Sequence, residues 1–383
     1  MNTEFKYALI LGTHPEISML ELERVLESKH ITYENLQQKQ GVAFLTTPTP
    51  LDHEALMNQL GGMIKIAEVV GPYNEETLVD WLFEHMNTET KFNFGFSVYP
   101  IEPGVKTKKD WKTIHTLGLA IKKILKAQDI SCRYVQSKEI VLSSVIVHKE
   151  RLLKNGVEIL LLKGKKGIIV AHTLAVQPFQ SFSKRDYGRP QRDHKSGMLP
   201  TKVARMMLNI AAPTSDDTIL DPFCGSGTVL QEALLLGFTK VIGADISEKS
   251  IQDTKENLSW LKLPEIPLHE HDVRSIDQIL KKGSINCVVA EGYLGPPSPK
   301  NIAGVRKDMA ALYKSTFGAL QKIVAPGARV VIGLPAWKNE KEILPLSLEY
   351  TQKNAGFTPF HKPLYYARPN ATVVRQIHFL EYK

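Results

Sequence analysis

The chain has 383 residues, of which 43% are hydrophobic and 23% charged. This composition is typical of a globular protein and excludes extended disorder, and the length predicts two or three domains. The three cysteines, Cys132, Cys224 and Cys287, offer neither a disulfide framework nor a CxxC pair for zinc. Because no apolar run approaches the roughly 20 residues that span a bilayer and no secretory signal is recognisable, we expect a cytoplasmic protein without a metal site.

Positive charge is concentrated in the middle of the chain. Residues 91–205 carry 23 Lys and Arg against 8 Asp and Glu, a balance of +15, whereas the remaining residues sum to −7. Such a concentration is typical of a surface that binds a polyanion such as RNA or DNA, and a solvated basic face without a partner is the alternative. The basic residues that we expect to contact RNA are Lys108, Lys109, Lys112, Lys165, Lys166, Arg185, Arg189 and Arg192.

The first 60 residues alternate strand and helix signals. Strands are predicted over residues 7–11 and 42–45, and helices from Pro15 onward and over residues 52–60. This pattern favours a small ferredoxin-like α+β unit.

A second α+β stretch follows. Its predicted elements are a strand at 92–99, a basic amphipathic helix at 111–126, a strand at 132–135, a helix at 143–154 and a hairpin of 157–162 with 167–173. Residues 177–197 are polar and aperiodic, which predicts a loop or linker. This segment also interleaves Phe, Tyr and Arg as a base-stacking surface would, and we leave both interpretations open.

From residue 198 onward strands and helices alternate regularly. Strands are predicted at 218–221, 241–245, 266–271, 285–290 and 329–334, and helices at 200–212, 229–236, 249–261, 276–281, 305–324 and about 340–353. Two consecutive strands follow, at 357–367 and 372–382. The alternation predicts an α/β fold with a mostly parallel sheet, helices on both faces and an antiparallel hairpin at the end.

A glycine turn follows the first of these strands. Residues 221–228 read Asp-Pro-Phe-Cys-Gly-Ser-Gly-Thr, and Gly225 and Gly227 leave room for a ligand against the backbone. Asp245 ends the next strand, where a carboxylate can hold a ribose diol. Asp272 follows the third strand and can meet an adenine amine, with a solvated loop acid as the alternative. The third glycine of the dinucleotide-binding pattern is missing, which disfavours NAD as the ligand of this turn.

The motif at 221–228 resembles the S-adenosylmethionine motif of Rossmann-like methyltransferases that modify exocyclic amines of nucleic-acid bases. Residues 185–193 and 196–204 resemble the THUMP-domain tRNA (guanine-N2) methyltransferases, and so do residues 11–18 and 173–177. The resemblance therefore extends over nearly the whole chain.

This resemblance implies a ferredoxin-like domain (1–65), a THUMP domain that grips the tRNA acceptor end (66–176), a linker (177–197) and a Rossmann-like methyltransferase domain with a seven-stranded sheet (198–383). It implies S-adenosylmethionine as cofactor and tRNA as substrate, methylated on a guanosine N2 near the base of the D-arm, at position 10. It leaves open the number of methyl groups, the need for a small activator protein and the oligomeric state. The residues implied for the cofactor are Pro200, Asp221, Phe223, Gly225, Gly227, Asp245, Ile246, Asp272 and Val273.

The expected catalytic strand departs from the family. Where members carry Asp-Pro-Pro-Tyr, residues 291–297 read Glu-Gly-Tyr-Leu-Gly-Pro-Pro. Glu291 can accept a hydrogen bond from an exocyclic amine, Gly292 allows close approach and Tyr293 can stack on a flipped base, so we expect Glu291 and Tyr293 to be catalytic. Two alternatives concern this strand: Glu291 caps a helix or pairs with a lysine, or catalysis is lost while RNA binding persists. A third alternative concerns the substrate, which would be DNA or rRNA instead of tRNA.

Overall fold

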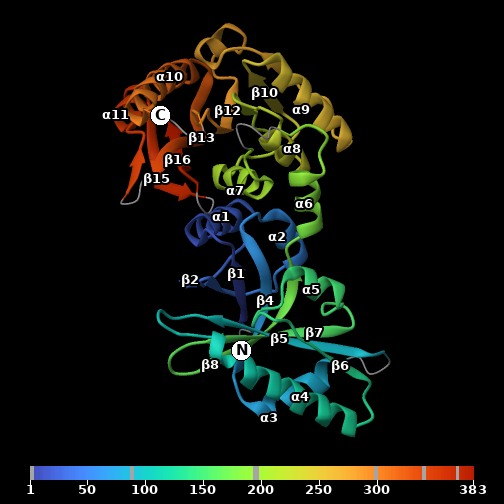
Figure 1. The fold of residues 1–383 in the computed structure, drawn as a ribbon. Helices are drawn as coiled ribbons and strands as arrows, with labels where there is room; N and C mark the ends of the chain where they lie inside the picture. Colours follow the sequence, from blue (N-terminus) through green and yellow to red (C-terminus); the bar gives the residue numbers. More distant parts are fainter. Residues whose placement is uncertain (1–3, 87–89, 193–197, 297–300, 339–341, 368–370) are drawn as a thin grey trace. The chain divides into compact units, whose positions relative to one another are not determined.

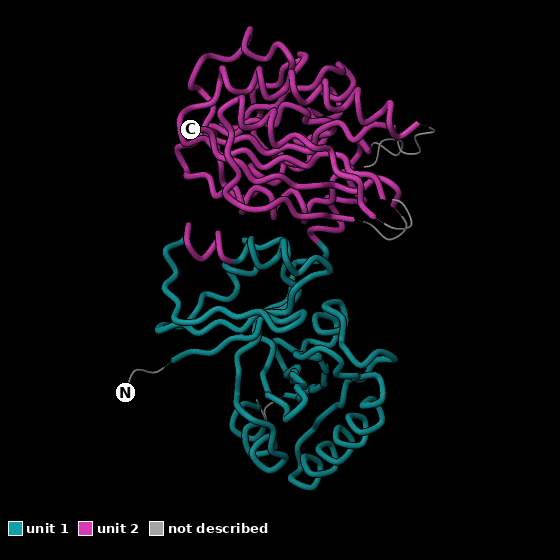
Figure 2. The backbone as a smooth tube through the Cα atoms, turned by 90° about the vertical axis from the view of Figure 1, so that its left-hand side faces the viewer, with its two compact units in different colours: residues 1–22, 29–180 teal, residues 23–28, 181–383 magenta. Residues whose placement is uncertain are grey.

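The computed structural model describes residues 4–86, 90–192, 198–296, 301–338, 342–367 and 371–383. The chain divides into two compact units (Figure 2), unit 1 with residues 1–22 and 29–180 and unit 2 with residues 23–28 and 181–383. Each unit contains one sheet with helices packed against it (Figure 1). None of the helices in the described part of the chain is long and apolar enough to cross a membrane.

The first half of unit 1 is the expected ferredoxin-like arrangement. Its elements are β1 (Phe5–Leu11), α1 (Pro15–Ser28), β2 (Asn35–Lys39), β3 (Val42–Thr47), α2 (His53–Gln59) and β4 (Met63–Pro72). The strands lie in the order β4-β1-β3-β2, and every neighbouring pair is antiparallel. This is the βαββαβ topology. Strands β2 and β4 were not expected from the sequence. Strand β2 is polar and mostly exposed at the edge of the sheet.

The second half of unit 1 extends the same sheet. Its elements are α3 (Glu75–His85), β5 (Phe92–Pro100), η1 (Lys108–Asp110), α4 (Trp111–Ala127), β6 (Cys132–Val135), α5 (Ser144–Lys149), β7 (Gly156–Lys163) and β8 (Ile168–Val176). Strands β7 and β8 form the predicted hairpin, and β8 pairs with β4, which gives one sheet of order β2-β3-β1-β4-β8-β7-β5-β6. The expected boundary after residue 65 falls inside β4, and the division into a ferredoxin-like and a THUMP domain stays a prediction.

Helix α4 is the basic amphipathic helix that its sequence predicts. Leu117, Ile121 and Leu125 recur every four residues and are buried against β5, together with Leu78 and Leu82 of α3. Burial of this apolar stripe leaves the lysines of α4 on its outer side.

Unit 2 contains the predicted alternation of strands and helices. Its elements are most of α6 (Phe179–Tyr187), then α7 (Thr201–Ala211), β9 (Ile219–Asp221), α8 (Thr228–Leu235), β10 (Val241–Asp245), α9 (Glu248–Trp260), β11 (Leu268–Glu270), η2 (Val273–Gln278), β12 (Ile285–Glu291), α10 (Ile302–Ile323), β13 (Val324–Lys338), β14 (Ile343–Pro345), α11 (Glu349–Asn354), β15 (Phe357–Tyr366) and β16 (Val373–Tyr382).

The sheet of unit 2 is mostly parallel, as expected. Its strands lie in the order β11-β10-β9-β12-β13-β16-β15, with β14 added beside β13. Neighbours from β11 to β13 are parallel, whereas β16 is antiparallel to both β13 and β15. Because β16 alone is reversed on this path, β15 runs in the same direction as the first five strands. The two consecutive strands at the end therefore form the predicted antiparallel hairpin.

Helices cover both faces of this sheet. Val288 and Ala290 of β12 belong to a buried cluster with Tyr313 and Phe317 of α10. The intervening Val289 points to the opposite face and is also fully buried. A strand that is apolar on both faces is typical of a sheet covered on two sides.

Three predicted segments of unit 2 differ from the structure. Part of the expected loop at 177–197 is helix α6, because Phe182 and Arg185, three positions apart, are both buried; residues 193–197 lie outside the described residues. The helix expected at 276–281 is the 3₁₀ helix η2, displaced toward the amino terminus. The helix expected at about 340–353 is instead the short strand β14 and the short helix α11. Pro345 lacks a backbone N–H and disfavours a helix there.

Candidate cofactor and catalytic site

Three carboxylates stand at the carboxyl ends of adjacent parallel strands in unit 2. Asp221 ends β9, Asp245 ends β10 and Glu291 ends β12. Because β9 lies between β10 and β12, the three strand ends are neighbours at one edge of the sheet. This edge is where open α/β sheets bind their ligands.

The glycine turn after β9 leaves an open backbone surface. Gly225 has φ +53°, and a Cβ added there would meet no atom nearer than the Phe223 carbonyl oxygen at 4.0 Å. Gly227 has φ +84°, and a Cβ there would lie 2.9 Å from the Thr254 side chain. Gly225 therefore offers room to a ligand, whereas Gly227 is required by its conformation and by packing.

Asp245 is fixed by the backbone on both of its carboxylate oxygens. The Gly225 N–H donates to Oδ2 over 2.9 Å and the Ser247 N–H donates to Oδ1 over 3.0 Å. Each oxygen retains a second acceptor position, which suits a pair of ribose hydroxyls. The neighbouring Ile246 exposes 66% of its surface, and such an apolar surface beside the carboxylate suits an adenine. Val273, also expected at the cofactor, is buried.

Asp221 lies under the turn rather than at its surface. Its side chain is buried, and its Oδ1 accepts the Phe223 N–H over 3.1 Å. Burial, together with the nearby Asp245 and Glu291, raises the pKa of this carboxyl well above its usual range. The structure thus gives Asp221 the role of shaping the turn, instead of the direct cofactor contact that the sequence suggested.

Asp272 caps helix η2 and is bound by a single arginine. Its carboxylate accepts hydrogen bonds from the backbone N–H, Nε and Nη2 of Arg274, and this guanidinium lowers the pKa of the carboxyl. Arg274 therefore binds both carboxylate oxygens of Asp272. The contact between Asp272 and adenine that the sequence suggested stays a prediction.

Glu291, the expected catalytic acid, is held by an arginine from the last strand. Nε of Arg375 on β16 donates to Oε1 of Glu291, and Nη2 of Arg375 donates to the Met198 carbonyl over 3.4 Å. Within the described part of the chain, Oε2 of Glu291 has no bound donor. One oxygen is therefore fixed while the other remains an acceptor. The cation that pairs with Glu291 is an arginine, not the lysine considered as an alternative.

The loop after Glu291 is positioned by a buried tyrosine. The hydroxyl of Tyr313 on α10 donates to the Tyr293 carbonyl over 2.7 Å. A Cβ on Gly292 would lie 2.3 Å from that hydroxyl oxygen, so only glycine fits here. The Tyr293 side chain is half exposed and is therefore available for stacking. Sequence reasoning found Glu291, Gly292 and Tyr293 but missed Arg375 and Tyr313, because nothing in the sequence shows which distant side chains meet this loop.

The arginines expected to contact RNA do not form one surface. Arg185 is buried and shares the carboxylate of Glu232 with Arg205, over 2.5 and 2.8 Å, so the prediction that it contacts RNA is wrong. Arg189 is also buried, beside the glycine turn, which contradicts the same prediction. Arg192 is half buried, and its guanidinium lies over the Tyr187 ring.

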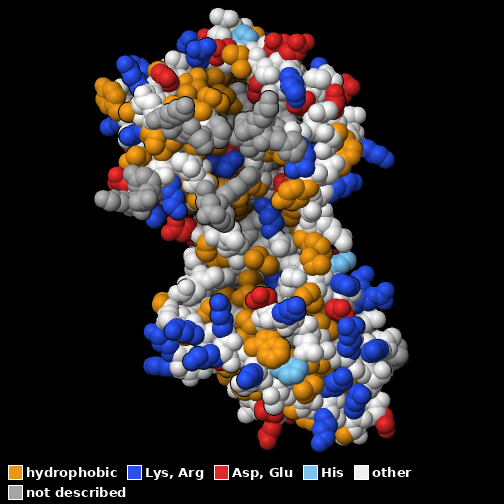
Figure 3. All heavy atoms as spheres, viewed as in Figure 1, with side chains coloured by type: hydrophobic (Ala, Val, Ile, Leu, Met, Phe, Trp, Pro, Cys, Tyr) orange, Lys and Arg blue, Asp and Glu red, His pale blue; other side chains and the backbone are white. Residues whose placement is uncertain are grey.

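The lysines expected to contact RNA are exposed on unit 1. Lys108 and Lys109 form the turn before α4, Lys112 follows in its first turn, and Lys165 and Lys166 lie between β7 and β8. None of the five has an ion-pair partner among the described residues. On the face of the molecule that Figure 3 shows, Lys and Arg side chains are spread over unit 1.

Trp111, at the start of α4, is 37% exposed among these lysines. Its indole Nε1 donates to the Ser137 carbonyl over 3.1 Å, and its ring stacks on His115 with centroids 5.1 Å apart. One edge of the ring is therefore fixed while part of its surface faces solvent.

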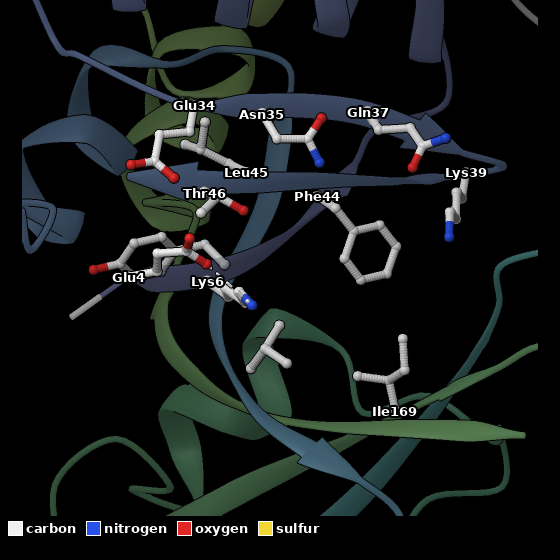
Figure 4. Close-up of a pocket in the computed structure, with 12 residues that line it drawn as sticks. Glu4, Lys6, Glu34, Asn35, Gln37, Lys39, Phe44, Leu45, Thr46 and Ile169 are labelled. Atoms are coloured by element: carbon white, nitrogen blue, oxygen red, sulfur yellow. Dashed lines mark ion pairs between the residues drawn. The ribbon is translucent and has the colours of Figure 1, made fainter. Parts of the chain in front are cut away.

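Unit 1 also has an open hollow of about 540 Å³ on its sheet (Figure 4). Phe44 and Ile169 contribute apolar side chains, and Lys6 and Lys39 face it together with Glu4. Because charges of both signs line this hollow, its electrostatics favour neither an anionic nor a cationic ligand. It lies in the other unit from the glycine turn.

Comparisons with known proteins find similarity to methyltransferases. Residues 189–359 match the family model of the RMKL-like methyltransferase domain, and residues 80–256 match a DNA methylase model. The chain is 24% identical over 344 residues to the tRNA (guanine(10)-N2)-dimethyltransferase of Methanothermobacter thermautotrophicus, covering 88% of this chain and 90% of the relative. It is 32% identical over 130 residues to the enzyme of the same name from Methanocaldococcus jannaschii, covering 32% of this chain and 37% of that one.

Solved structures share the whole fold. TrmN from Thermus thermophilus superimposes with a TM-score of 0.61 at 17% identity, covering 99% of this chain and all of that one. SMU.472, a putative methyltransferase complexed with S-adenosylhomocysteine (SAH), superimposes with a TM-score of 0.53 at 13% identity, covering 98% of each chain.

The fold and the carboxyl-edge site define a Rossmann-like, S-adenosylmethionine-dependent methyltransferase. More specifically, the chain is similar over 88% of its length to a relative named as a tRNA (guanine(10)-N2)-dimethyltransferase, in agreement with the resemblance of its motifs. The residues present fit the cofactor: Gly225 leaves open backbone, and Asp245 presents an oriented carboxylate with spare acceptor capacity.

Asp245 supplies a direct test of the ribose site. We expect Asp245→Asn to raise the dissociation constant of SAH about 10-fold, because a neutral amide replaces one charged acceptor. Isothermal titration calorimetry with SAH measures this change. Asp216→Asn removes an exposed carboxylate from the same unit and serves as the control. Equal SAH affinity in Asp245→Asn and the wild type would exclude the ribose role.

Proposed function

We propose that this protein methylates the exocyclic N2 of a guanosine in tRNA, at position 10, with S-adenosylmethionine as methyl donor. The observation that carries the proposal is the Glu291 carboxylate at the sheet edge, with Oε1 bound to Arg375 and Oε2 available to an amine. Similarity over most of its length to a tRNA (guanine(10)-N2)-dimethyltransferase supports the choice of substrate.

The residues of the site account for the difficulty of the reaction. The bound cofactor supplies an electrophilic methyl group. The lone pair of a guanine amine is delocalised into the ring, so the amine is a poor nucleophile. Oε2 of Glu291 accepts an N–H of that amine and favours localisation of the lone pair, while Arg375 keeps the carboxylate in one orientation. Tyr293 stacks on the flipped base and holds the amine in line with the methyl group.

The exposed lysines of unit 1 supply the RNA-binding part of the proposal. Five of them lie around the start of α4 and the β7–β8 turn without ion-pair partners among the described residues. Free cations on a surface bind phosphates and release counterions from the RNA. Residues 66–176 act as the THUMP domain in this proposal. The enzyme acts in the cytoplasm, where its three free cysteines remain reduced.

Replacing three of these lysines tests the RNA surface. We expect Lys108→Ala/Lys109→Ala/Lys112→Ala to weaken tRNA binding and to reduce the slope of log Kd against log salt by roughly 2–3 units, since each phosphate contact contributes about one. Filter binding at several salt concentrations measures both quantities. The control Lys262→Ala/Lys281→Ala/Lys282→Ala removes three exposed lysines from unit 2. If the control and the test variant lose affinity equally, the surface at α4 is not the RNA site.

The activity itself is tested with purified protein, unmodified tRNA transcripts and labelled S-adenosylmethionine, followed by mass spectrometry of the nucleosides. We expect N2-methylated guanosine, lost when the guanosine at position 10 is replaced by adenosine. The same spectra count the methyl groups. Methylated adenine or cytosine, or label in DNA or rRNA but not in tRNA, would overturn the proposed substrate.

A further inference from the structure

The open hollow of unit 1 takes no part in the methyl transfer proposed above (Figure 4). Its volume of about 540 Å³ is in the range of sites that bind small molecules or parts of larger ones. Every residue that lines it lies in one of the strands β1, β2, β3, β4 and β8 or directly before one of them. The hollow is therefore a surface of the sheet itself, accessible from solvent.

Phe44 on β3 contributes an aromatic ring to this hollow. It packs on the edge of a buried apolar cluster together with Val69 and Ile169, and all three side chains are only partly buried. Figure 4 shows the Phe44 ring in the hollow, between β3 and Ile169. A partly exposed ring with apolar neighbours can receive a second flat ring by stacking.

Uncharged polar side chains stand beside this ring. The register of β2 on β3 places Gln37 opposite Phe44 and Asn35 opposite Thr46. Because side chains alternate along a strand, Asn35 and Gln37 share one face of β2, and both are exposed. Side-chain amides both donate and accept hydrogen bonds, so they can pair with the edge of a heterocycle. Sheets that bind single-stranded RNA combine an aromatic ring and hydrogen-bonding side chains in this way.

The charges of the hollow favour an uncharged group inside it and a phosphate at one end. Lys6 already pairs with Glu4 over 3.2 Å. Lys39 ends β2 without an ion-pair partner among the described residues, and its Nζ lies 5.5 Å from the centre of the Phe44 ring. Glu34 lies at the opposite end of β2 and repels a phosphate there. A phosphate next to the bound group is therefore favoured at Lys39.

The hollow also borders lysines to which we assign RNA binding. Lys165 and Lys166 lie in the turn between β7 and β8, and Ile169 of the hollow follows Lys166 by three residues. Three residues of extended chain span roughly 10 Å. A strand of RNA whose phosphates contact this turn can therefore place a neighbouring base over Phe44.

We propose that the hollow binds one unpaired base of the RNA, stacked on Phe44 and hydrogen-bonded by Asn35 and Gln37, with the adjacent phosphate at Lys39. The inference rests on the proposed function, since it assumes that unit 1 holds the RNA. It adds a contact made through a base instead of through charge alone. This base is not the methylated one, because the hollow and Glu291 belong to different units.

Two strands with the same backbone charge provide the test: a fluorescein-labelled RNA hexanucleotide of mixed sequence and the same strand with abasic sugars. By fluorescence anisotropy we expect Phe44→Leu to lose about 5- to 50-fold in affinity for the strand with bases, because leucine keeps the apolar packing but not the ring. It should bind the abasic strand as the wild type does. Phe44→Tyr keeps the ring and should keep the affinity. Phe83→Leu removes an exposed ring from α3 of the same unit and serves as the control.

A second pair of variants does not depend on the packing of Phe44. Gln37→Glu and Gln38→Glu add the same charge to opposite faces of β2, at positions that are both exposed. We expect Gln37→Glu to weaken binding of the strand with bases about 3- to 10-fold, because the new carboxylate repels the phosphate next to the bound base. Gln38→Glu should bind this strand as the wild type does.

Two results would overturn the inference. One is equal affinity of a folded Phe44→Leu protein and the wild type for the strand with bases, and the other is an equal loss in Gln37→Glu and Gln38→Glu. These measurements require neither S-adenosylmethionine nor methyl transfer. A protein that binds the hexanucleotide through Phe44 but does not methylate tRNA would contradict the proposed function alone, so the two proposals fail separately.

Discussion

Glu291→Gln should lower kcat for tRNA methylation by about 10²- to 10⁴-fold, the range of positioned acid–base groups. Glutamine keeps an oxygen that accepts from Arg375, so the packing of the loop is preserved. Its second position is an NH2 group, which donates and cannot accept the N–H of the guanine amine. Single-turnover kinetics with saturating tRNA and S-adenosylmethionine measure the effect on methyl transfer.

The same variant should bind SAH as the wild type does, because Asp245 and the glycine turn are untouched. Glu270→Gln is the matched control, since Glu270 also ends a parallel strand of this sheet but is exposed. A rate for Glu291→Gln within a few-fold of the wild type would remove Glu291 from the mechanism and would leave its ion pair with Arg375 as a structural contact.

Glu232→Gln should destabilise unit 2 by about 3–5 kcal/mol, because it leaves two guanidiniums buried without a counter-charge. Glu232 on α8 is fully buried and binds Arg185 of α6 and Arg205 of α7. For a unit of this size the loss corresponds to a fall in Tm of roughly 6–20 °C. Scanning fluorimetry with and without SAH measures it.

Glu265→Gln neutralises an exposed acid of unit 2 and should change the free energy of unfolding by no more than about 0.5 kcal/mol. A Glu232→Gln protein with unchanged Tm would show that the two arginines find other partners or water.

Much of the secondary structure of unit 2 was predictable because the sequence patterns that indicate it are local. Strands and helices alternate along the chain, and the turn at 221–228 and the acids at 245 and 291 follow apolar strands directly. The parallel connection of such strands brings their carboxyl ends to one edge, so Asp245 and Glu291 were placed correctly before any side chain was seen.

The remaining features depend on long-range contacts. Its charged sequence surroundings predicted that Arg185 contacts RNA. In the folded chain, however, helix α8 places Glu232 beside it, and the two form a buried ion pair. Arg375 meets Glu291 only because β16 inserts into the sheet beside β13, which itself borders β12. In unit 1, β2 carries two glutamines and a lysine at the sheet edge and lacks the apolar alternation by which strands are recognised.

Strand β4 has a consequence for the synthesis of this protein. Its two neighbours are β1, which precedes it, and β8, which ends at Val176. While the ribosome is still translating the residues between them, one side of β4 has no partner, and an open strand edge invites aggregation. The nascent chain must therefore emerge through Val176 before this sheet closes, and a fragment that stops at residue 65 would retain only the first three residues of β4.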